Sequence, residues 1–226
     1  MLEIIFQDQY MVVINKPHGL LVHRSSIAAD AEEFALQMVR DQIGKTVYPV
    51  HRLDRKTSGI LVFALNSRMA ARLKTIFENP ETQKTYIAIV RGYFPDAIEV
   101  DYALTNDRGK TQDAITHFKT IRRNELPVPF GQFDTSRYSL IEAYPKTGRM
   151  HQIRKHLNHL RHPIIGDRPH GCNKQNRLFK ERWNMTTMLL HAHQLEFEHP
   201  LTTEKLVLKA EPFEEFKRML HTLELE

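Results

Sequence analysis

Short apolar runs separated by polar turns predict strands along most of the chain. Residues 2–6 and 11–15 flank the polar Gln7-Asp8-Gln9, a pattern typical of a β-hairpin. The run from Ile60 to Leu65 is apolar throughout and predicts a buried strand. Residues 125–134 contain two prolines and a glycine, and are predicted to form a loop between strands. Further strands are predicted at residues 82–93, 100–104, 114–121, 137–144, 188–197 and 205–210.

Apolar residues spaced three and four apart predict helices between these strands. The first helix, over residues 30–43, has Asp30 as a suitable N-cap and ends at Gly44. A second helix follows Asn66 or Ser67, with an apolar face of Ala70, Leu73, Ile76 and Phe77. Later helices are predicted at residues 153–160 and 212–223, with a loop and a short helix within residues 166–187. No internal repeat or low-complexity tract is present, so one domain over residues 1–226 is the simplest organisation.

Charge is concentrated in the nonapeptide from His51 to Gly59, just before the predicted buried strand. Asp54 is the one carboxylate among the cations Arg52, Arg55 and Lys56. Because nearby positive charge favours the ionised form of a carboxyl group, Asp54 can act as a nucleophile, a base or a stabiliser of positive charge. Turn-forming residues follow it, so we expect Asp54 on a loop anchored by a strand, a common position for catalytic residues. The alternative is a surface aspartate in a salt-bridged loop.

Two residues outside this stretch allow either a binding role or a structural one. Lys16 precedes Pro17, where a bend is predicted, and its ammonium group can either meet a phosphate or cap a loop. Tyr86 is near the beginning of the strand predicted at residues 82–93. Its ring is either part of the core or a surface on which a base stacks.

Residues 145–167 form a second stretch rich in charged residues, and its cations surround one apolar stripe with helical spacing. Such a helix suits a phosphate backbone or an ion pair with a distant carboxylate. His156 and His159 stand three residues apart, but they lack the spacing and companions of a metal site, so no metal is predicted. The cations singled out here are Arg149, Arg154, Lys155 and Arg161.

Composition points to an anionic partner and excludes several protein classes. The 226 residues are 41% hydrophobic and 26% charged, as in soluble globular proteins. The net charge of +5 favours a partner such as nucleic acid, and 13 histidines can add positive charge near neutral pH. Cys172 is the single cysteine, so no internal disulfide is possible. There is no signal segment and no apolar run of about 18 residues, so we expect a cytoplasmic protein without membrane contact.

Taken together, these motifs resemble the pseudouridine synthases of the RluA family over nearly the whole chain. Within the family, Leu21 to Ser25 and His159 to Asp167 are most similar to members that modify uridine 65 of tRNA. The matching segments stand in the family's order: Asn15-Lys16-Pro17 with Gly19 and Val22-His23; His51-Arg52-Leu53-Asp54 with Thr57-Ser58-Gly59; Lys84-Thr85-Tyr86; Gly148-Arg149 with His151-Gln152-Ile153-Arg154 and His156; His162-Pro163-Ile164 with Gly166-Asp167; and His191-Ala192 with Leu195 and Phe197.

The resemblance implies roles for individual residues. Asp54 matches the essential aspartate, Arg154 the arginine that pairs with it, and Tyr86 the tyrosine that packs on the target uracil. Arg52 matches the arginine that fills the gap left by a flipped nucleotide. The further residues predicted to contact the RNA are His51, Arg55, Lys16, Arg149, Lys155 and Arg161.

The resemblance also implies a fold and shows two departures. The expected fold is α+β, with a mixed, mainly antiparallel, bent sheet, flanking helices and a central RNA-binding cleft. His170 stands where relatives often have tyrosine, and Thr203 stands where they usually have glycine. Neither position belongs to the catalytic set, so these departures bear on local loop geometry.

The implied reaction is an isomerisation, in which the bond from ribose C1′ to uracil N1 breaks and C1′ bonds to C5. It needs no redox change, so no cofactor is expected. A uridine inside a paired stem must be extruded first. Asp54 could add to C1′, add to C6 of the uracil or take the C2′ proton, and the sequence leaves these alternatives open. We expect a monomer without an obligatory protein partner.

The expected substrate is tRNA, and other functions stay open at this stage. Ribosomal RNA is an alternative substrate for the same family. A hydrolytic nucleoside glycosylase could use the same anion, but it would release free base. A non-catalytic RNA-binding module would explain the basic charge without needing Asp54.

Overall fold

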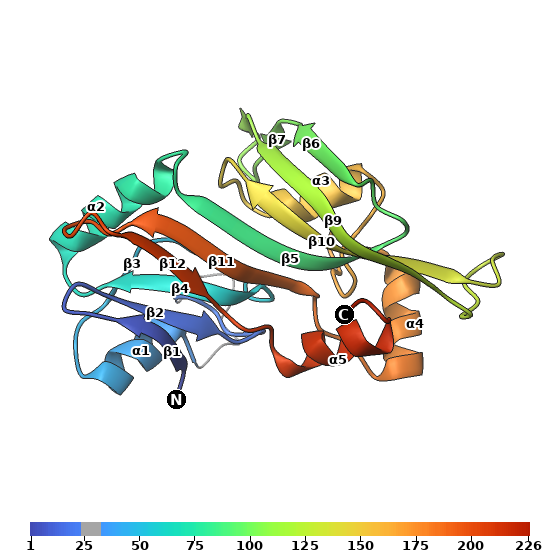
Figure 1. Cartoon of the computed structure of the whole chain (residues 1–226), viewed down its shortest axis with the longest axis horizontal. Coiled ribbons are helices and arrows are strands. Elements are labelled where there is room, and N and C mark those ends of the chain that lie inside the picture. The colour runs from blue at the N-terminus through green and yellow to red at the C-terminus, as the bar shows by residue number, and fades with distance from the viewer. Residues whose placement is uncertain (24–32) are drawn as a thin grey trace. The chain divides into compact units, whose positions relative to one another are not determined.

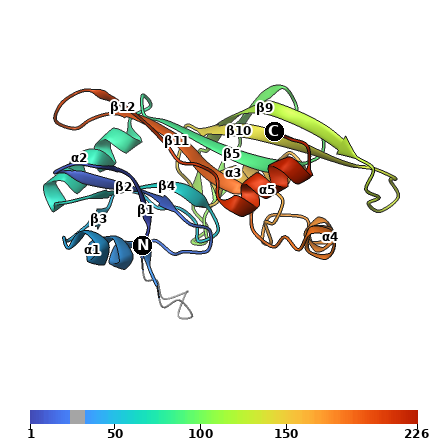
Figure 2. The same ribbon diagram turned by 60° about the horizontal axis from the view of Figure 1, so that its bottom comes forward.

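In a computed structural model of the chain, residues 1–23 and 33–226 are described, and they form two compact units (Figures 1 and 2). Unit 1 comprises the described residues up to Lys84 together with 191–213, and unit 2 comprises residues 85–190 and 214–226. We describe each unit by itself. One catalytic domain over residues 1–226 therefore stays a prediction.

Unit 1 is built on a mixed sheet in which one strand pair is parallel. The strands lie in the order β1-β2-β4-β11, with β12 paired to β11 and β3 paired to β4. The parallel pair is β4 with β11, where Ser58 faces His191 and Gly59 faces Ala192. The other pairs are antiparallel, including the predicted hairpin of β1 and β2. The strands are β1 (Glu3–Gln7), β2 (Met11–Lys16), β3 (Tyr48–Pro49), β4 (Ser58–Ala64), β11 (Leu190–Glu198) and β12 (Lys205–Lys209).

Two helices accompany this sheet, α1 (Ala35–Ile43) and α2 (Ser67–Glu78). The side chain of Asn66 accepts a hydrogen bond of 2.8 Å from the backbone N–H of Met69, so the predicted cap of α2 is confirmed. Asp30, predicted to cap α1, lies outside the described residues, and so do residues 24 and 25 of the family motif. The core of unit 1 joins α2 to the sheet through buried residues such as Val62, Leu73 and Leu195.

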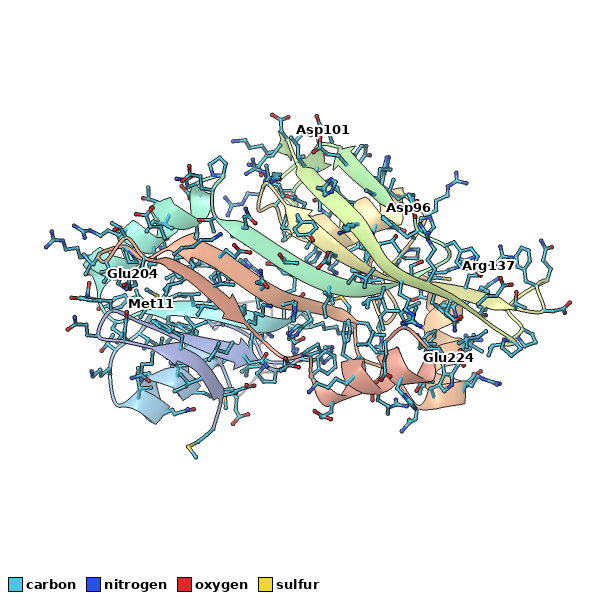
Figure 3. All side chains as sticks on the ribbon, viewed as in Figure 1. Met11, Asp96, Asp101, Arg137, Glu204 and Glu224 are labelled. Carbon is cyan, nitrogen blue, oxygen red and sulfur yellow. The ribbon has the colours of Figure 1, made fainter. Side chains whose placement is uncertain are left out.

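Unit 2 has an antiparallel sheet in the order β5-β10-β9-β6. A small β7-β8 hairpin accompanies it, which the sequence did not predict because each strand has only two residues. Arg123 and Arg137 of the longer strands form ion pairs with Asp96 and Glu125; Figure 3 labels Asp96 and Arg137. The strands are β5 (Gln83–Arg91), β6 (Ala97–Asp101), β7 (Leu104–Thr105), β8 (Thr111–Gln112), β9 (Ile115–Leu126) and β10 (Ser136–Pro145).

The helices of unit 2 are α3 (Gln152–His159), α4 (Asn173–Trp183) and α5 (Glu214–Thr222). The stripe predicted on α3 is confirmed, because Ile153 and Leu157 are buried against residues of β5, β9 and β10. The guanidinium group of Arg218 on α5 donates to the carbonyl of Trp183 at the end of α4, at 2.9 Å.

The prediction of a mixed, mainly antiparallel α+β fold is confirmed, with five helices in the part of the chain that the structure describes. The loop predicted at residues 125–134 is confirmed as a connection between β9 and β10. Within residues 1–23 and 33–226, no helix is long and apolar enough to cross a membrane. The central cleft stays a prediction.

Candidate active site

Asp54 lies on a short loop between β3 and β4. Val50 and Leu53 are buried, so apolar packing anchors the loop on the N-terminal side of Asp54. On the other side, the backbone N–H of Thr57 donates to the carbonyl of Asp54 at 3.0 Å, and the buried Ser58 begins β4. Asp54 itself is half-buried. The loop therefore presents Asp54 from the predicted position, at the start of a buried strand.

Lys16 fastens this loop to the bend that follows β2. Its ammonium group donates to the carbonyls of Pro17 at 2.9 Å, Leu20 at 2.8 Å and Arg55 at 3.2 Å. Gly19 and Arg55 add a backbone hydrogen bond of 2.9 Å, and the Arg55 side chain donates to the carbonyl of Gly19 at 3.1 Å. Two turns distant in sequence are thus joined around one buried cation.

The charge of Lys16 is strongly influenced by its surroundings. The side chain is fully buried. Burial lowers the pKa of Lys16 to about 7, and the negative charge of Asp54 opposes that shift. Lys16 and Asp54 are therefore electrostatically coupled within unit 1. Of the two roles weighed for Lys16, this burial fits the loop cap and does not fit a phosphate contact.

The neighbouring residues of the nonapeptide divide into exposed and structural ones. Arg52 and Arg55 are exposed. The guanidinium group of Arg52 makes no hydrogen bond or ion pair to any residue that the structure describes. His51 instead accepts a hydrogen bond of 3.1 Å from the backbone N–H of Val62 and packs against Phe77. Burial lowers the pKa of His51 to about 3, so it is a neutral acceptor, which suits a structural role better than the predicted RNA contact.

A buried pair of residues from two of the matching motifs, Ser58 and His191, holds the start of β4. Ser58 Oγ lies 2.8 Å from His191 Nδ1, and His191 Nε2 lies 3.1 Å from the carbonyl of Ala210. Because the carbonyl can only accept, Nε2 carries the proton and Nδ1 accepts from the serine hydroxyl. Burial lowers the pKa of His191 to about 4 and keeps the ring neutral. The residue after the Thr57 turn is thereby fixed to β11.

In unit 2, Arg154 forms a buried two-bond ion pair with Asp167. Arg154 Nε lies 2.7 Å from Oδ2 and Nη2 lies 2.8 Å from Oδ1, with side chains only 6% and 1% exposed. Burial alone would raise the pKa of Asp167, but the hydrogen bonds and charge of Arg154 hold it below its usual range. The guanidinium plane is therefore fixed by a rigid fork. The pairing of Arg154 with Asp54 would join the two units, and it stays a prediction.

The turn that carries Asp167 requires its glycine. A Cβ at Gly166 would lie 1.8 Å from the carbonyl oxygen of Thr187, and φ at Gly166 is +83°. Asp167 also accepts from the backbone N–H of His170 at 3.2 Å. No role was predicted for Asp167 from the sequence, although the Gly-Asp pair after an apolar run was the available signal.

His170, one of the two departures from the family pattern, contacts a second histidine. His170 Nε2 lies 2.9 Å from His151 Nδ1. Burial, followed by the charge of Arg154, lowers the pKa of His170. A neutral imidazole can therefore take part in this bond in place of the tyrosine that relatives often have.

The other predicted site residues of unit 2 lie in several environments. Tyr86 is half-buried on β5, opposite Ala143 of β10, and its ring packs against the core of unit 2. Arg149 and Lys155 donate to the carbonyls of Asp113 at 2.9 Å and Thr105 at 3.2 Å. Arg161 is exposed. Two of these three cations therefore also brace nearby loops.

His156, which was considered with His159 as a possible metal ligand, makes structural hydrogen bonds through its ring. Its two ring nitrogens lie 3.0 Å from Thr116 Oγ1 and 3.0 Å from the carbonyl of Tyr102. His159 stacks on Tyr102, with ring centroids 3.9 Å apart. Both rings thus pack the β6–β7 connection onto α3.

Comparison with known families gives a match over most of the chain. A family model described as RNA pseudouridylate synthase matches residues 10–159. A Vibrio cholerae protein described as tRNA pseudouridine synthase C is 48% identical over 221 residues, covering 93% of this chain and 91% of that protein. A Yersinia pestis protein of the same description is 45% identical over 221 residues, covering 93% of this chain and 86% of that protein.

Solved structures agree with the fold. Human RNA pseudouridylate synthase domain containing 4 matches with a TM-score of 0.75 and 27% identity, covering 98% of this chain and 93% of that chain. Human RNA pseudouridylate synthase domain containing 1 gives a TM-score of 0.73 at 20% identity, covering 100% of this chain and 96% of that chain, and this likeness concerns the fold alone.

Proposed function

Since the chain belongs to the RNA pseudouridylate synthase family, whose members are isomerases, we propose that it converts a uridine of tRNA into pseudouridine. The family membership expected from the sequence motifs is confirmed. The tRNA substrate is carried over from the relatives described as tRNA pseudouridine synthase C. We further propose uridine 65 as the target, on the similarity of residues 159–167 to members that modify that position.

The observation that supports the catalytic role of Asp54 is the construction of its loop. The loop is anchored by buried Leu53 and by the Lys16 ammonium group, while Asp54 itself is only half-buried. A carboxylate on a rigid support can be held in the geometry that a reaction requires. A structural surface aspartate would not need a buried cation beneath its own turn.

In the proposed reaction, Asp54 acts on the ribose or the uracil while the C1′–N1 bond breaks. The uracil then turns and its C5 bonds to C1′, after which C5 loses its proton and N1 takes up a proton, so that the product is an isomer of uridine. Arg154, whose plane Asp167 fixes, would orient Asp54 through a second charge-assisted contact. Asp167 is therefore proposed as a positioning residue for Arg154.

Base flipping would bring the target uridine to Asp54. Extrusion of a nucleotide costs a few kcal/mol of stacking and pairing. The exposed Arg52 would fill the vacated stack, and the half-buried ring of Tyr86 would pack on the flipped uracil. Arg55, Arg149, Lys155 and Arg161 are proposed as further contacts to the RNA backbone.

Replacing Asp54 by asparagine tests this function directly. Asparagine keeps the size of the side chain but removes its charge, so Asp54→Asn should form no measurable pseudouridine in tRNA. Its affinity for tRNA should stay within a few-fold of wild type, because Asp54 makes no attractive contact with phosphate. The measurement is chromatography of nucleosides from digested tRNA, together with a binding titration.

The matched control is Asp107→Asn, which removes a carboxylate at an exposed position between β7 and β8 and should be fully active. Substantial pseudouridine formation by Asp54→Asn would refute the role of Asp54. Release of free uracil by the wild-type enzyme would instead indicate a glycosylase. Product in ribosomal RNA and none in tRNA would reassign the substrate.

A further inference from the structure

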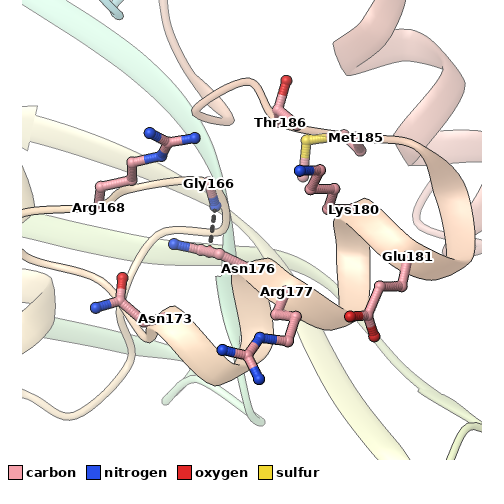
Figure 4. Close-up of a pocket in the computed structure, with 9 residues that line it drawn as sticks. All are labelled: Gly166, Arg168, Asn173, Asn176, Arg177, Lys180, Glu181, Met185 and Thr186. Atoms are coloured by element: carbon pink, nitrogen blue, oxygen red, sulfur yellow. Dashed lines mark hydrogen bonds between the residues drawn. The ribbon is translucent and has the colours of Figure 1, made fainter.

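A basic pocket lies between α4 and the Gly166–Asp167 turn, and none of the residues proposed above to contact RNA lines it (Figure 4). Its volume is about 400 Å³, within the usual range of ligand sites. All of its lining belongs to unit 2. The lining residues are Gly166, Arg168, Asn173, Asn176, Arg177, Lys180, Glu181, Met185 and Thr186.

The pocket holds positive charge that the described protein does not neutralise. Arg168, Arg177 and Lys180 are exposed, and none of their side chains forms a hydrogen bond or ion pair within residues 1–23 and 33–226. Glu181 is the carboxylate in the lining, and it makes no ion pair with these cations in the same described part. Three cations around one pocket repel each other, and an anion bound there would relieve that repulsion.

Three other exposed arginines of unit 2, by contrast, have carboxylate partners. Arg123 pairs with Asp96 at 2.6 Å, and Arg137 pairs with Glu125 at 3.0 Å. Arg218 pairs with Glu215 at 2.8 Å. The positive charge of these three arginines is thus balanced within the unit, whereas that of the pocket is not.

The wall of the pocket is rigid and continuous with the anchor of Arg154. The side-chain oxygen of Asn176 accepts from the backbone N–H of Gly166 at 2.9 Å, and its nitrogen donates to the carbonyl of Asp167 at 2.7 Å. The carboxylate of the same Asp167 holds Arg154. One turn therefore connects α4, with its cations, to the arginine proposed to orient Asp54.

We propose that this pocket binds a phosphate of the RNA substrate and so fixes the RNA backbone to the element that carries Arg154. The inference rests on the proposed function, since it takes the bound anion to be part of that RNA. Two guanidinium groups offer paired donors that fit phosphate oxygens, and Lys180 adds a mobile point charge. Asn173, exposed in the first turn of α4, supplies an uncharged amide donor.

The test compares two double variants that each remove two positive charges. Arg168→Ala with Lys180→Ala empties the pocket of two of its cations. Lys174→Ala with Arg182→Ala removes two exposed charges from α4 that do not line the pocket. Binding of unmodified tRNA is titrated over a series of salt concentrations, and thermal melts check that all proteins are folded.

The pocket variant should bind tRNA about tenfold more weakly than wild type, because it loses charge-assisted hydrogen bonds. The slope of log affinity against log salt should become shallower by roughly 1.5, the value for two lost phosphate contacts. The control variant should change the affinity less than about threefold and leave the slope close to wild type. At saturating tRNA, the control variant should retain the wild-type turnover.

Equal affinities and slopes for the two double variants would overturn the proposal. A second outcome would also overturn it: inorganic phosphate raises the melting temperature of wild type but not of the pocket variant, while the two proteins bind tRNA equally well. The pocket would then bind a small free anion and not a phosphate of the RNA. The affinity readout does not depend on turnover. A wild-type enzyme that binds tRNA without forming pseudouridine would refute the proposed function. The affinities of the two double variants would still show whether the pocket binds RNA.

Discussion

At the scale of single residues, the same charged side chain can serve a substrate or the fold, and burial separates the two. Lys16, Arg52 and Arg55 were all predicted to contact RNA, on their position beside the motif of Asp54. The structure buries Lys16 completely among three carbonyls, whereas Arg52 is exposed. Sequence could locate these cations, but it could not show which one lies beneath the loop, because that depends on how two distant turns meet.

Replacing Lys16 by methionine should weaken catalysis without changing how the enzyme responds to salt. The variant loses the anchor of the Asp54 turn, so we expect kcat to fall about tenfold or more, by analogy with misplaced catalytic groups. Lys16 is buried and donates to three carbonyls, so we expect the dependence of tRNA affinity on salt to match wild type. Turnover assays and binding titrations measure the two effects.

Arg52→Met is the comparison for this experiment, because it removes an exposed cation of the same loop. If Arg52 contacts the RNA backbone or fills its stack, the affinity of this variant should fall. A salt dependence of Lys16→Met that is shallower by roughly 0.7 to 0.9 would show that Lys16 contacts a phosphate after all.

Thr203, one of the two departures from the family pattern, has a backbone conformation that favours the usual glycine. The sequence has threonine where relatives usually have glycine, and Thr203 has a φ of 59° in the turn between β11 and β12. A β-branched residue is disfavoured in that left-handed region. The unusual residue could therefore be recognised from sequence, whereas its strain depends on a backbone angle.

Thr203→Gly should stabilise the protein by about 1 kcal/mol, because glycine adopts a positive φ without the penalty of a Cβ. The measurement is the free energy of unfolding in urea. Thr202→Gly is the matched control, since Thr202 is not among the positive-φ residues, and it should be neutral or destabilising. Equal effects of the two substitutions would contradict the explanation.

At the scale of elements, hydrophobic periodicity predicted most helices and strands but not how they join. The α2 helix and its Asn66 cap follow from local pattern and capping chemistry, and both are confirmed. The β7-β8 hairpin was missed because two-residue strands carry no periodicity. The parallel pairing of β4 with β11 could not be predicted either, because these strands are far apart in sequence.

That parallel pairing depends on Gly59, so Gly59→Ala should be severely destabilising. A Cβ at Gly59 would lie 2.2 Å from the backbone oxygen of Ala192, and φ at Gly59 is +107°. A backbone neighbour cannot move aside as a flexible side chain can, so we expect a loss of about 3 kcal/mol or more. Urea unfolding measures the loss.

Gly109→Ala separates the two causes of this effect. Gly109 also has a positive φ, of +75°, but nothing lies within 4 Å of the position that a Cβ would occupy there. Only the backbone penalty applies at this site, so the expected loss is about 1 kcal/mol. Similar losses at both glycines would mean that the contact with β11 contributes little.

At the scale of the whole molecule, the net charge is +5 with every histidine neutral. Protonation of the 13 histidines would raise it as the pH approaches 6, but the fold keeps some of them neutral. Burial is the first cause that lowers the pKa of His18 to about 4, of His51 to about 3 and of His191 to about 4. These three residues belong to unit 1. Composition alone therefore overstated the charge that histidines can add, because the fold keeps these rings neutral.

The same three histidines predict how stability depends on pH. In the unfolded chain a histidine binds a proton near pH 6.5, whereas these residues in the folded protein do not until about pH 3 to 4. Between these values the unfolded state binds more protons, so stability falls as pH falls. Each group contributes at most about 1.4 kcal/mol per pH unit to this slope.

His51→Gln should make this decline shallower, because glutamine cannot be protonated in this range and its oxygen can still accept from the N–H of Val62. The variant loses the ring contact with Phe77, so it should be less stable than wild type at pH 7.5 by about 1 kcal/mol. Between pH 6.5 and 4.5, however, its free energy of unfolding should fall less steeply than that of wild type, and urea titrations at several pH values measure both slopes. His221→Gln is the matched control for the loss of an imidazole, at a position where the side chain is 82% exposed. Equal slopes for wild type and His51→Gln would mean that folded His51 binds its proton as readily as an unfolded histidine, which would contradict its assignment as a neutral acceptor.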